Sequence, residues 1–290
     1  GLTALPGALA GSALPTSVLV LRRGAGAGTA WAGAASSFGA ALGVALVTFV
    51  VGPAWGVASA LRLVAVGYAL AALLGWSATQ NTPAPPPPES PSAQPLVTDR
   101  VLLVTVVLLG VASTGWQTVT TRLGELSFGP SAFALAAALA AHVSALALGE
   151  LVALRWITRT PPERHRDALG RVVLFAAGMS LVALPLALRL PSFAEARLAH
   201  GAPPLTTLWA TAWAFIAAAS LPVVGTLGAA MAFAASALAT RDGSARDDRA
   251  AALANGRLLV TMGAGNVLGA VLVSFAVMPL ARVEGAMLFV

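Results

Sequence analysis

The sequence contains no cysteine and no lysine, and it has only three histidines. Without cysteine the chain has no disulfide, no thiolate metal site and no cysteine nucleophile. Three separate histidines are too few to predict a metal cluster, so we expect neither a metal nor a cofactor. All 17 basic residues are therefore arginines.

Charge is also scarce, at 10% of the residues, whereas 58% are hydrophobic. A soluble domain has about 25% charged residues. Apolar runs of about 20 residues recur along the chain, and each is long enough to cross roughly 30 Å of hydrocarbon. The runs are continuous rather than alternating, which predicts helices instead of strands. We therefore expect an all-α, polytopic helical membrane protein with the lipid bilayer as its main partner.

The apolar runs predict about eight complete transmembrane helices and a truncated ninth. A Pro-rich linker at 77–98, which contains the run PAPPPPES, separates a first part (1–76) from a second part (99–290). The predicted spans are 4–21, 29–51, 57–76, 99–121, 131–155, 170–190, 205–240 and 257–280, with a ninth beginning at 284–290.

The arginines are distributed unequally between the two sides of the predicted bundle. If 205–240 is one crossing bent at Pro222, twelve arginines lie in loops on one side and four on the other. This asymmetry predicts a multi-pass protein of the bacterial cytoplasmic membrane with its Arg-rich loops in the cytoplasm. The net charge of +6 then reflects topology, and we expect no nucleic-acid partner. The mixed-charge stretch 163–167 is expected to be a solvated loop.

The chain also repeats itself. Residues 37–53 align with 263–279 at a shift of 226, which superposes Gly39 on Gly265, Gly43 on Gly269 and Pro53 on Pro279. The two copies have the same predicted direction across the membrane. This parallel repeat is typical of transporters built from two halves. We expect 1–76 to be the last three helices of a first half and 99–290 to be an incomplete second half.

Four segments resemble the membrane region of fused spermidine synthase-like proteins. The segment Trp116–Leu123, which continues to Phe128-Gly129, is similar to the family pattern YQVVWxRLLxxxFG. The other three segments are 5–15, 145–150 and 256–279. The resemblance implies a polytopic domain that precedes an aminopropyltransferase-like domain, and that enzyme domain is absent from these 290 residues. The segment itself is not expected to be catalytic.

The sequence departs from this family at polar positions. Glu150 stands where the family has serine, and Leu259 and Met262 replace its tyrosine and asparagine. In the first copy, Trp31 replaces the arginine found at Arg257. Roles of the missing polar residues are therefore not transferred to this chain.

Two ionisable residues fall inside the predicted span 131–155, where charge is costly. His142 lies near its middle, and it can serve proton coupling, amine binding or only a helix–helix hydrogen bond. Glu150 follows two turns later, about 80° around the helix, so the two side chains can border one cavity. A carboxylate there suits a small cationic solute, although pairing with Arg155 or simple hydration is the alternative.

Gln117, Arg122 and Glu125 lie close together at the other end of the predicted span 99–121. Arg122 and Glu125 are spaced i,i+3 and are expected to pair, either as an interfacial anchor or as part of a gate. Two functions from different classes follow. One is transport or channelling of a polyamine or another small amphipathic solute. The other is a non-catalytic membrane anchor or assembly subunit that binds other subunits or an appended soluble domain.

Overall fold

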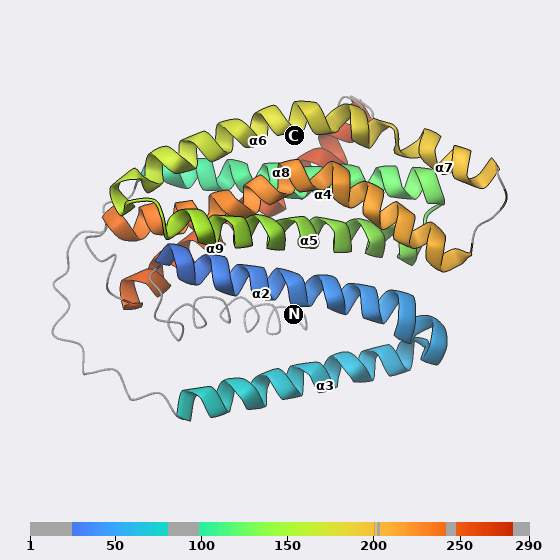
Figure 1. The fold of residues 1–290 in the computed structure, drawn as a ribbon, viewed down its shortest axis with the longest axis horizontal. Helices are drawn as coiled ribbons and strands as arrows, with labels where there is room; N and C mark the ends of the chain where they lie inside the picture. The colour runs from blue at the N-terminus through green and yellow to red at the C-terminus, as the bar shows by residue number, and fades with distance from the viewer. Residues whose placement is uncertain (1–24, 81–98, 200, 202–203, 242–247, 281–290) are drawn as a thin grey trace.

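The structure is a computed structural model of the chain, and it describes residues 25–80, 99–199, 201, 204–241 and 248–280. Within these ranges the chain forms helices and no strand, which confirms the predicted all-α class for them (Figure 1). The elements are α2 (Ala25–Leu46), η1 (Val47–Val51), α3 (Gly52–Gln80), α4 (Arg100–Phe128), α5 (Ala132–Ile157), η2 (Pro162–Arg164), α6 (His165–Leu188), α7 (Leu190–Ala199), α8 (Leu205–Arg241), α9 (Asp248–Leu272) and η3 (Val273–Val277).

Six helical segments are long and apolar enough to cross a membrane, as expected of a multi-pass membrane protein. Each has between 26 and 38 residues, against the roughly 20 that a bilayer requires. They overlap six of the predicted spans. They run over Gly26–Gly56, Arg100–Phe128, Ala132–Ile157, Pro162–Ala199, Thr207–Leu238 and Asn255–Leu280.

The remaining predicted spans have different outcomes. Those at 4–21 and 284–290 lie outside the described residues. The span at 57–76 lies in α3, whose apolar part, Ala58–Ala71, is shorter than a full crossing. The helix α3 also continues to Gln80, into the predicted linker. Within this continuation the Ser77 hydroxyl donates to the Leu74 carbonyl of the same helix at 2.9 Å.

The stretch 205–240 is a single helix, α8, as the arginine distribution predicted. Pro222 lies within it and has no N–H to donate to the carbonyl four residues earlier. One turn later, the Thr226 hydroxyl donates to the carbonyls of Pro222 at 2.9 Å and Val223 at 2.7 Å. The helix therefore passes through the proline without ending.

The helices α5 and α8 form the centre of the bundle, with α2 packed on α5 and α6 packed on α8 (Figure 1). The helices α4 and α9 pack on each other, and α4 also contacts α5 and α8. The helix α3 lies apart from the other long helices and contacts η1 (Figure 1).

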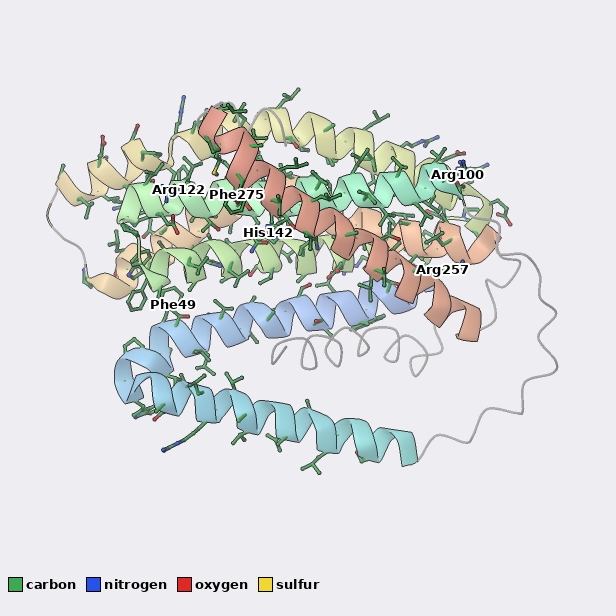
Figure 2. All side chains as sticks on the ribbon, turned by 180° about the vertical axis from the view of Figure 1, so that it is seen from behind. Phe49, Arg100, Arg122, His142, Arg257 and Phe275 are labelled. Atoms are coloured by element: carbon green, nitrogen blue, oxygen red, sulfur yellow. The ribbon has the colours of Figure 1, made fainter. Side chains whose placement is uncertain are left out.

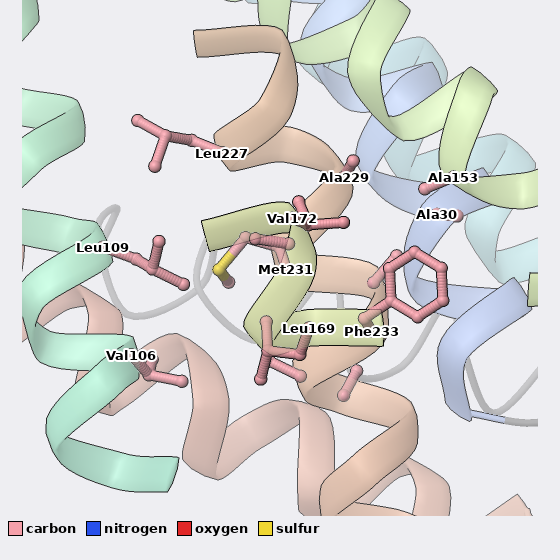
Figure 3. Close-up of a cluster of buried hydrophobic side chains, with 14 of the residues drawn as sticks. Ala30, Val106, Leu109, Ala153, Leu169, Val172, Leu227, Ala229, Met231 and Phe233 are labelled. Carbon is pink, nitrogen blue, oxygen red and sulfur yellow. The ribbon is translucent and has the colours of Figure 1, made fainter. Parts of the chain in front are cut away.

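The main core is built around α8, which contributes Met231 and Phe233 to a cluster that also receives Leu109 from α4 and Val172 from α6 (Figure 3). Many of the other buried residues are alanines, so backbones approach one another closely. The closest approach joins α5 to α8, where a Cβ on Gly149 would lie only 1.7 Å from the Gly225 carbonyl oxygen. Such small-residue contacts are the usual way that membrane helices associate.

The bundle has one end that we call the arginine end, at which α4, α6 and α9 begin and α5 finishes. Figure 2 shows Arg100 and Arg257 at this end, with Arg122 toward the opposite end and His142 between them. Arg155 lies in the last turn of α5, at the same end. Arg100, Arg155 and Arg257 therefore lie on the opposite side from Arg122 of any membrane that the helices span.

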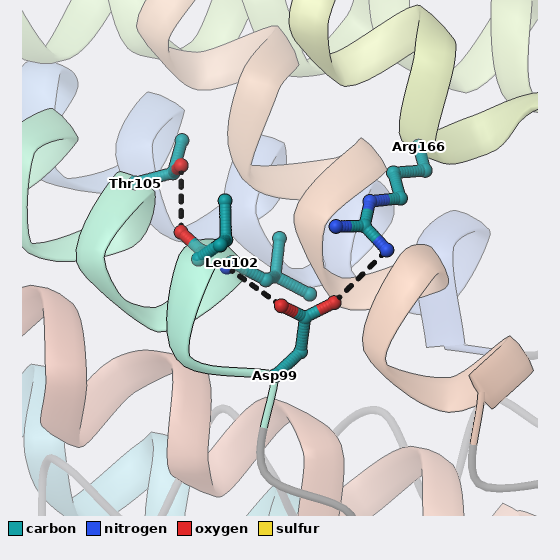
Figure 4. Close-up of polar contacts among 5 residues, drawn as sticks. Asp99, Leu102, Thr105 and Arg166 are labelled. Carbon is teal, nitrogen blue, oxygen red and sulfur yellow. Dashed lines mark hydrogen bonds and ion pairs between the residues drawn. The ribbon is translucent and has the colours of Figure 1, made fainter.

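An ion pair and a helix cap connect two helices at the arginine end (Figure 4). Asp99 precedes α4, and its Oδ1 accepts a hydrogen bond from the Leu102 backbone N–H at 3.2 Å. Its Oδ2 lies 3.2 Å from the Arg166 guanidinium at the start of α6. The nearly buried Asp99 carboxylate therefore satisfies an otherwise unpaired N–H and holds the beginnings of α4 and α6 together.

The sequence repeat also appears in the backbone. The π-helical segments η1 (Val47–Val51) and η3 (Val273–Val277) are offset by 226 residues, the same shift as the sequence alignment. Each precedes an equivalent proline, Pro53 or Pro279, that cannot donate to the carbonyl four residues before it. The wider turn follows, with Gly52 N–H bonded to the Val47 carbonyl and Met278 N–H to that of Val273.

Candidate functional site

A polar stripe runs along one side of α4. Thr114, Gln117, Thr118 and Thr121 are spaced i, i+3, i+4 and i+7, which places them on one helix face. All four line a cavity of about 780 Å³ in the half of the bundle away from the arginine end. We call it the α4–η3 cavity. Polar residues at membrane depth normally line a water-filled or solute-filled space, because hydrocarbon offers them no partners.

The opposite wall of this cavity comes from the second repeat. Ser274 projects from η3, and Met278 and Pro279 follow it. The π-helical turn caused by Pro279 therefore forms part of the wall, consistent with the frequent occurrence of such turns at functional sites. Leu135 from α5 adds an apolar surface. The cavity is thus polar on α4 and largely apolar elsewhere, which suits an amphipathic ligand.

The predicted pairing of Arg122 with Glu125 is confirmed at 2.9 Å, and both residues line the same cavity. The Arg122 side chain is 54% exposed, so the pair contributes at most about 1 kcal/mol to stability. The pair uses Oε2 of Glu125, and Oε1 remains able to accept another hydrogen bond. Gln117 lines this cavity too, so an amide, a carboxylate and a guanidinium share one space.

Thr118 of the stripe can accept a hydrogen bond from a ligand but has no free proton to donate. The Thr118 hydroxyl donates to the Thr114 carbonyl at 2.8 Å, so its proton is already in use. Its oxygen lone pairs remain available to accept. Glu125 Oε1 and the side-chain oxygen of Gln117 are further acceptors in this cavity, so an N–H-rich solute has partners there, beside the N–H donors of the Gln117 amide and of Arg122.

His142 lies outside this cavity and is buried in the centre of the bundle (Figure 2). Its Nε2 and the Ser113 hydroxyl of α4 are 3.4 Å apart, and one turn along α4 the Trp116 indole N–H donates to Ser220 of α8 at 3.2 Å. These contacts join α4, α5 and α8 through polar groups. His142 Nδ1 has no hydrogen-bond partner among the described residues. A buried polar atom left unpaired costs about 1–3 kcal/mol, so a water molecule or a polar ligand bound at this nitrogen would be stabilising.

Glu150 faces a different helix. Its Oε2 accepts a hydrogen bond from Ser37 of α2 at 3.2 Å, and the carboxylate lies against Gly33, where a Cβ would be 2.3 Å from Oε1. The structure therefore places His142 against α4 and Glu150 against α2, about 12 Å apart along α5. Neither one lines the α4–η3 cavity, so the candidate residues fall into three separate places.

Two other polar contacts were not predicted from the sequence. Thr29 of α2 donates a hydrogen bond to Asn255 of α9, and both residues are buried. The repeat alignment can be extended toward the N-terminus at the same shift of 226, and it then pairs position 29 with position 255. This equivalence was the sequence feature from which the contact could have been predicted.

His165 also differs from expectation, because the stretch 163–167 was predicted to be a solvated loop. His165 instead begins α6 and is buried, with its Nδ1 2.5 Å from the Ser236 hydroxyl and its Nε2 2.9 Å from the Thr160 carbonyl. Its ring packs edge-on against Phe233 at 5.8 Å. The reason is geometric: the first turn of α6 directs this one side chain of the charged stretch toward α8.

Comparison with known protein families finds a match over residues 52–190 to the family described as the alpha/beta-hydrolase family N-terminus. The matched residues extend from the start of α3 to the first residue of α7 and make up slightly less than half of the chain. No curated protein and no solved structure matches the chain.

Proposed function

We propose that the chain is a solute-binding membrane domain, similar to that of fused spermidine synthase-like proteins, which transports or channels a small cationic or amphipathic solute such as a polyamine. The observation that carries this proposal is the α4–η3 cavity of about 780 Å³, lined by a continuous polar stripe at membrane depth. Its volume lies in the range of small-molecule sites.

The chemistry of the cavity favours an amine. The oxygens of Thr118, Gln117 and Glu125 are hydrogen-bond acceptors, and an ammonium group is a donor without an acceptor. Hydrogen bonds to charged groups contribute about 1.5–3 kcal/mol each. Arg122 limits the negative charge of the site, so a solute with both an amine and an apolar part fits better than a bare cation.

We further propose that the parallel repeat extends over two halves, with eight crossings and the first residues of a ninth in this chain. Beyond the non-helical backbone of Gly56, α3 continues over residues 57–80, about 36 Å of helix, and can serve as one of the crossings. The arginine end then faces the cytoplasm of a bacterial cell, following the rule that positively charged loops remain inside.

The test is equilibrium binding of spermidine to the complete protein in lipid nanodiscs, measured by calorimetry. Gln117→Leu and Glu125→Gln should each weaken binding by about 10-fold or more, since the first removes an acceptor and the second removes the negative charge that attracts an ammonium group. Glu195→Gln, an exposed carboxylate on α7, is the matched control and should bind normally. Unchanged binding in both cavity variants would contradict the proposal.

A second function is favoured by the family match, namely a non-catalytic membrane anchor for an enzyme domain or for other subunits of a membrane complex. The matched region belongs to a family whose name refers to the N-terminus of alpha/beta-hydrolases. Mild-detergent purification of the complete protein distinguishes the two functions. An anchor should copurify with a stable soluble domain or partner and bind no spermidine, whereas the first proposal requires saturable spermidine binding.

A further inference from the structure

A second cavity, of about 760 Å³, lies between α5 and α6 with α8 as its floor. We call it the α5–α6 crevice. Val152 and Trp156 belong to one wall, Phe175 and Met179 belong to the other, and Gly225 and Pro222 lie on the floor. It shares no lining residue with the α4–η3 cavity.

The crevice exists because of small residues on its floor. Gly149 and Gly225 allow α5 to approach α8 until their backbones touch, and neither contributes a side chain that would fill the space above. The Thr226 hydroxyl is bonded to carbonyls of its own helix and offers no free proton. Away from Arg171 and Trp156 at the arginine end, the lining is therefore apolar and has no donor that would retain water.

The crevice opens toward the lipid side of the bundle. Val152 is 51% exposed and Phe175 is 57% exposed, and both lie on helices that are long and apolar enough to span a membrane. Large apolar side chains exposed on such helices face hydrocarbon. An apolar crevice that is open to hydrocarbon admits an acyl chain without the cost of expelling bound water.

A single charged residue, Arg171, lies in the lining of the crevice. It lies in the second turn of α6, which begins at the arginine end beside the Asp99–Arg166 pair. No carboxylate of the described residues is within ion-pair distance of the Arg171 guanidinium. Trp156, in the last turn of α5, adds an aromatic ring of the kind found at lipid head-group level.

We propose that the α5–α6 crevice is a binding site for an anionic phospholipid, with one acyl chain between α5 and α6 and the head-group phosphate on Arg171. A guanidinium matches a phosphate in shape and charge. Basic pockets between membrane helices are a known way of recognising anionic head groups. The site does not depend on the proposed solute function.

The test uses the complete protein purified from nanodiscs that contain equal amounts of phosphatidylglycerol and phosphatidylcholine, with retained lipids counted by native mass spectrometry. The unaltered protein should retain phosphatidylglycerol in preference. Arg171→Gln should lower this preference about tenfold, because a charge-assisted contact is lost. Arg159→Gln, an exposed arginine at the same end that does not line the crevice, is the matched control.

A second variant tests the acyl-chain half of the site. Val152→Trp fills the crevice from its exposed wall and should remove retention of both lipids, whereas Val182→Trp, exposed on α6 outside the crevice, should retain them. Normal lipid retention by Val152→Trp would overturn the proposal. So would equal effects of Arg171→Gln and Arg159→Gln, or a protein subunit cross-linked in the crevice in place of lipid.

Discussion

The Thr29 hydroxyl of α2 donates a hydrogen bond to the Asn255 side-chain oxygen of α9, and the two residues occupy the same position in the two repeats, 226 residues apart. When two copies are related by a two-fold rotation, equivalent residues meet only near the rotation axis. If the two copies are related by such a rotation, as the proposed parallel repeat requires, the contact places its axis between the beginnings of α2 and α9. Parallel repeats related by an axis along the membrane normal have this arrangement.

The absence of cysteine makes the Thr29–Asn255 contact directly testable, since no native thiol has to be removed. Thr29→Cys combined with Asn255→Cys should form a disulfide under mild oxidation, seen as a mobility shift on gel electrophoresis. Ala35→Cys with Asn255→Cys is the control, because Ala35 is exposed on α2 and lies nearly two turns further along. Equal cross-linking of the two pairs would show that α2 and α9 do not meet as described.

The repeat also predicts that equivalent glycines differ in importance. Gly265 of α9 packs against α4, where a Cβ would lie 2.2 Å from the Val107 carbonyl oxygen. Its equivalent, Gly39 of α2, has no described neighbour within 4 Å of a Cβ. Gly265→Ala should lower the free energy of unfolding by about 1–3 kcal/mol through overpacking. Gly39→Ala should leave it unchanged or raise it by up to about 1 kcal/mol.

Thermal unfolding of both variants in the same detergent is the measurement, and each variant serves as the control for the other. A comparable loss in both would indicate that Gly39 also has a close neighbour in the folded protein.

The sequence allowed the helices to be predicted better than their contacts. The bounds of α5 follow from local apolar length, and the Arg122–Glu125 pair follows from i,i+3 spacing. The continuity of α8 through Pro222 follows from the distribution of arginines between the loops. The neighbours of Glu150 do not follow, because α5 is alanine- and leucine-rich on every side. With no polar face to orient the helix, nothing local indicates that residue 142 faces α4 while residue 150 faces α2.

The carboxylate of Glu150 requires the absence of a side chain at Gly33. Gly33→Ala alone should therefore destabilise the α2–α5 contact, and Glu150→Ala alone should remove the hydrogen bond from Ser37. In the double variant the alanine at 33 meets no carboxylate, so its effect should be smaller than in the single variant. The coupling energy from the four unfolding measurements should be about 1–3 kcal/mol. Strict additivity would mean that the two positions are not in contact.

The cap at the beginning of α4 should matter more than the ion pair beside it. Asp99→Ala removes both the hydrogen bond to the Leu102 N–H and the pair with Arg166, and the loss of the cap should account for about 0.5–2 kcal/mol of its cost. Arg166→Gln removes only the pair with a guanidinium side chain that is 59% exposed, and should cost about 0–1 kcal/mol. Asp99→Asn keeps the cap and should resemble Arg166→Gln. Hydrogen exchange of residues 100–104 measures the fraying directly, and similar exchange in Asp99→Ala and Arg166→Gln would contradict this order.

The polar stripe on α4 should be accessible to water although it lies deep in the bundle. Thr118 is 18 residues into α4, and Leu181 is 16 residues into α6, so both lie about 24–27 Å from the arginine end. Thr118 lines the α4–η3 cavity, whereas Leu181 is 67% exposed on a helix long and apolar enough to span the membrane, so it faces lipid. A cysteine at 118 should therefore react with a charged, membrane-impermeant thiol reagent in intact membranes, and a cysteine at 181 should not, because thiolate formation and reagent access both require water.

Spermidine should slow the reaction at 118 if the solute occupies this cavity. An unreactive cysteine at 118 would mean that the stripe packs against another helix in the membrane, and the solute site would then have to be sought at Glu150 or His142.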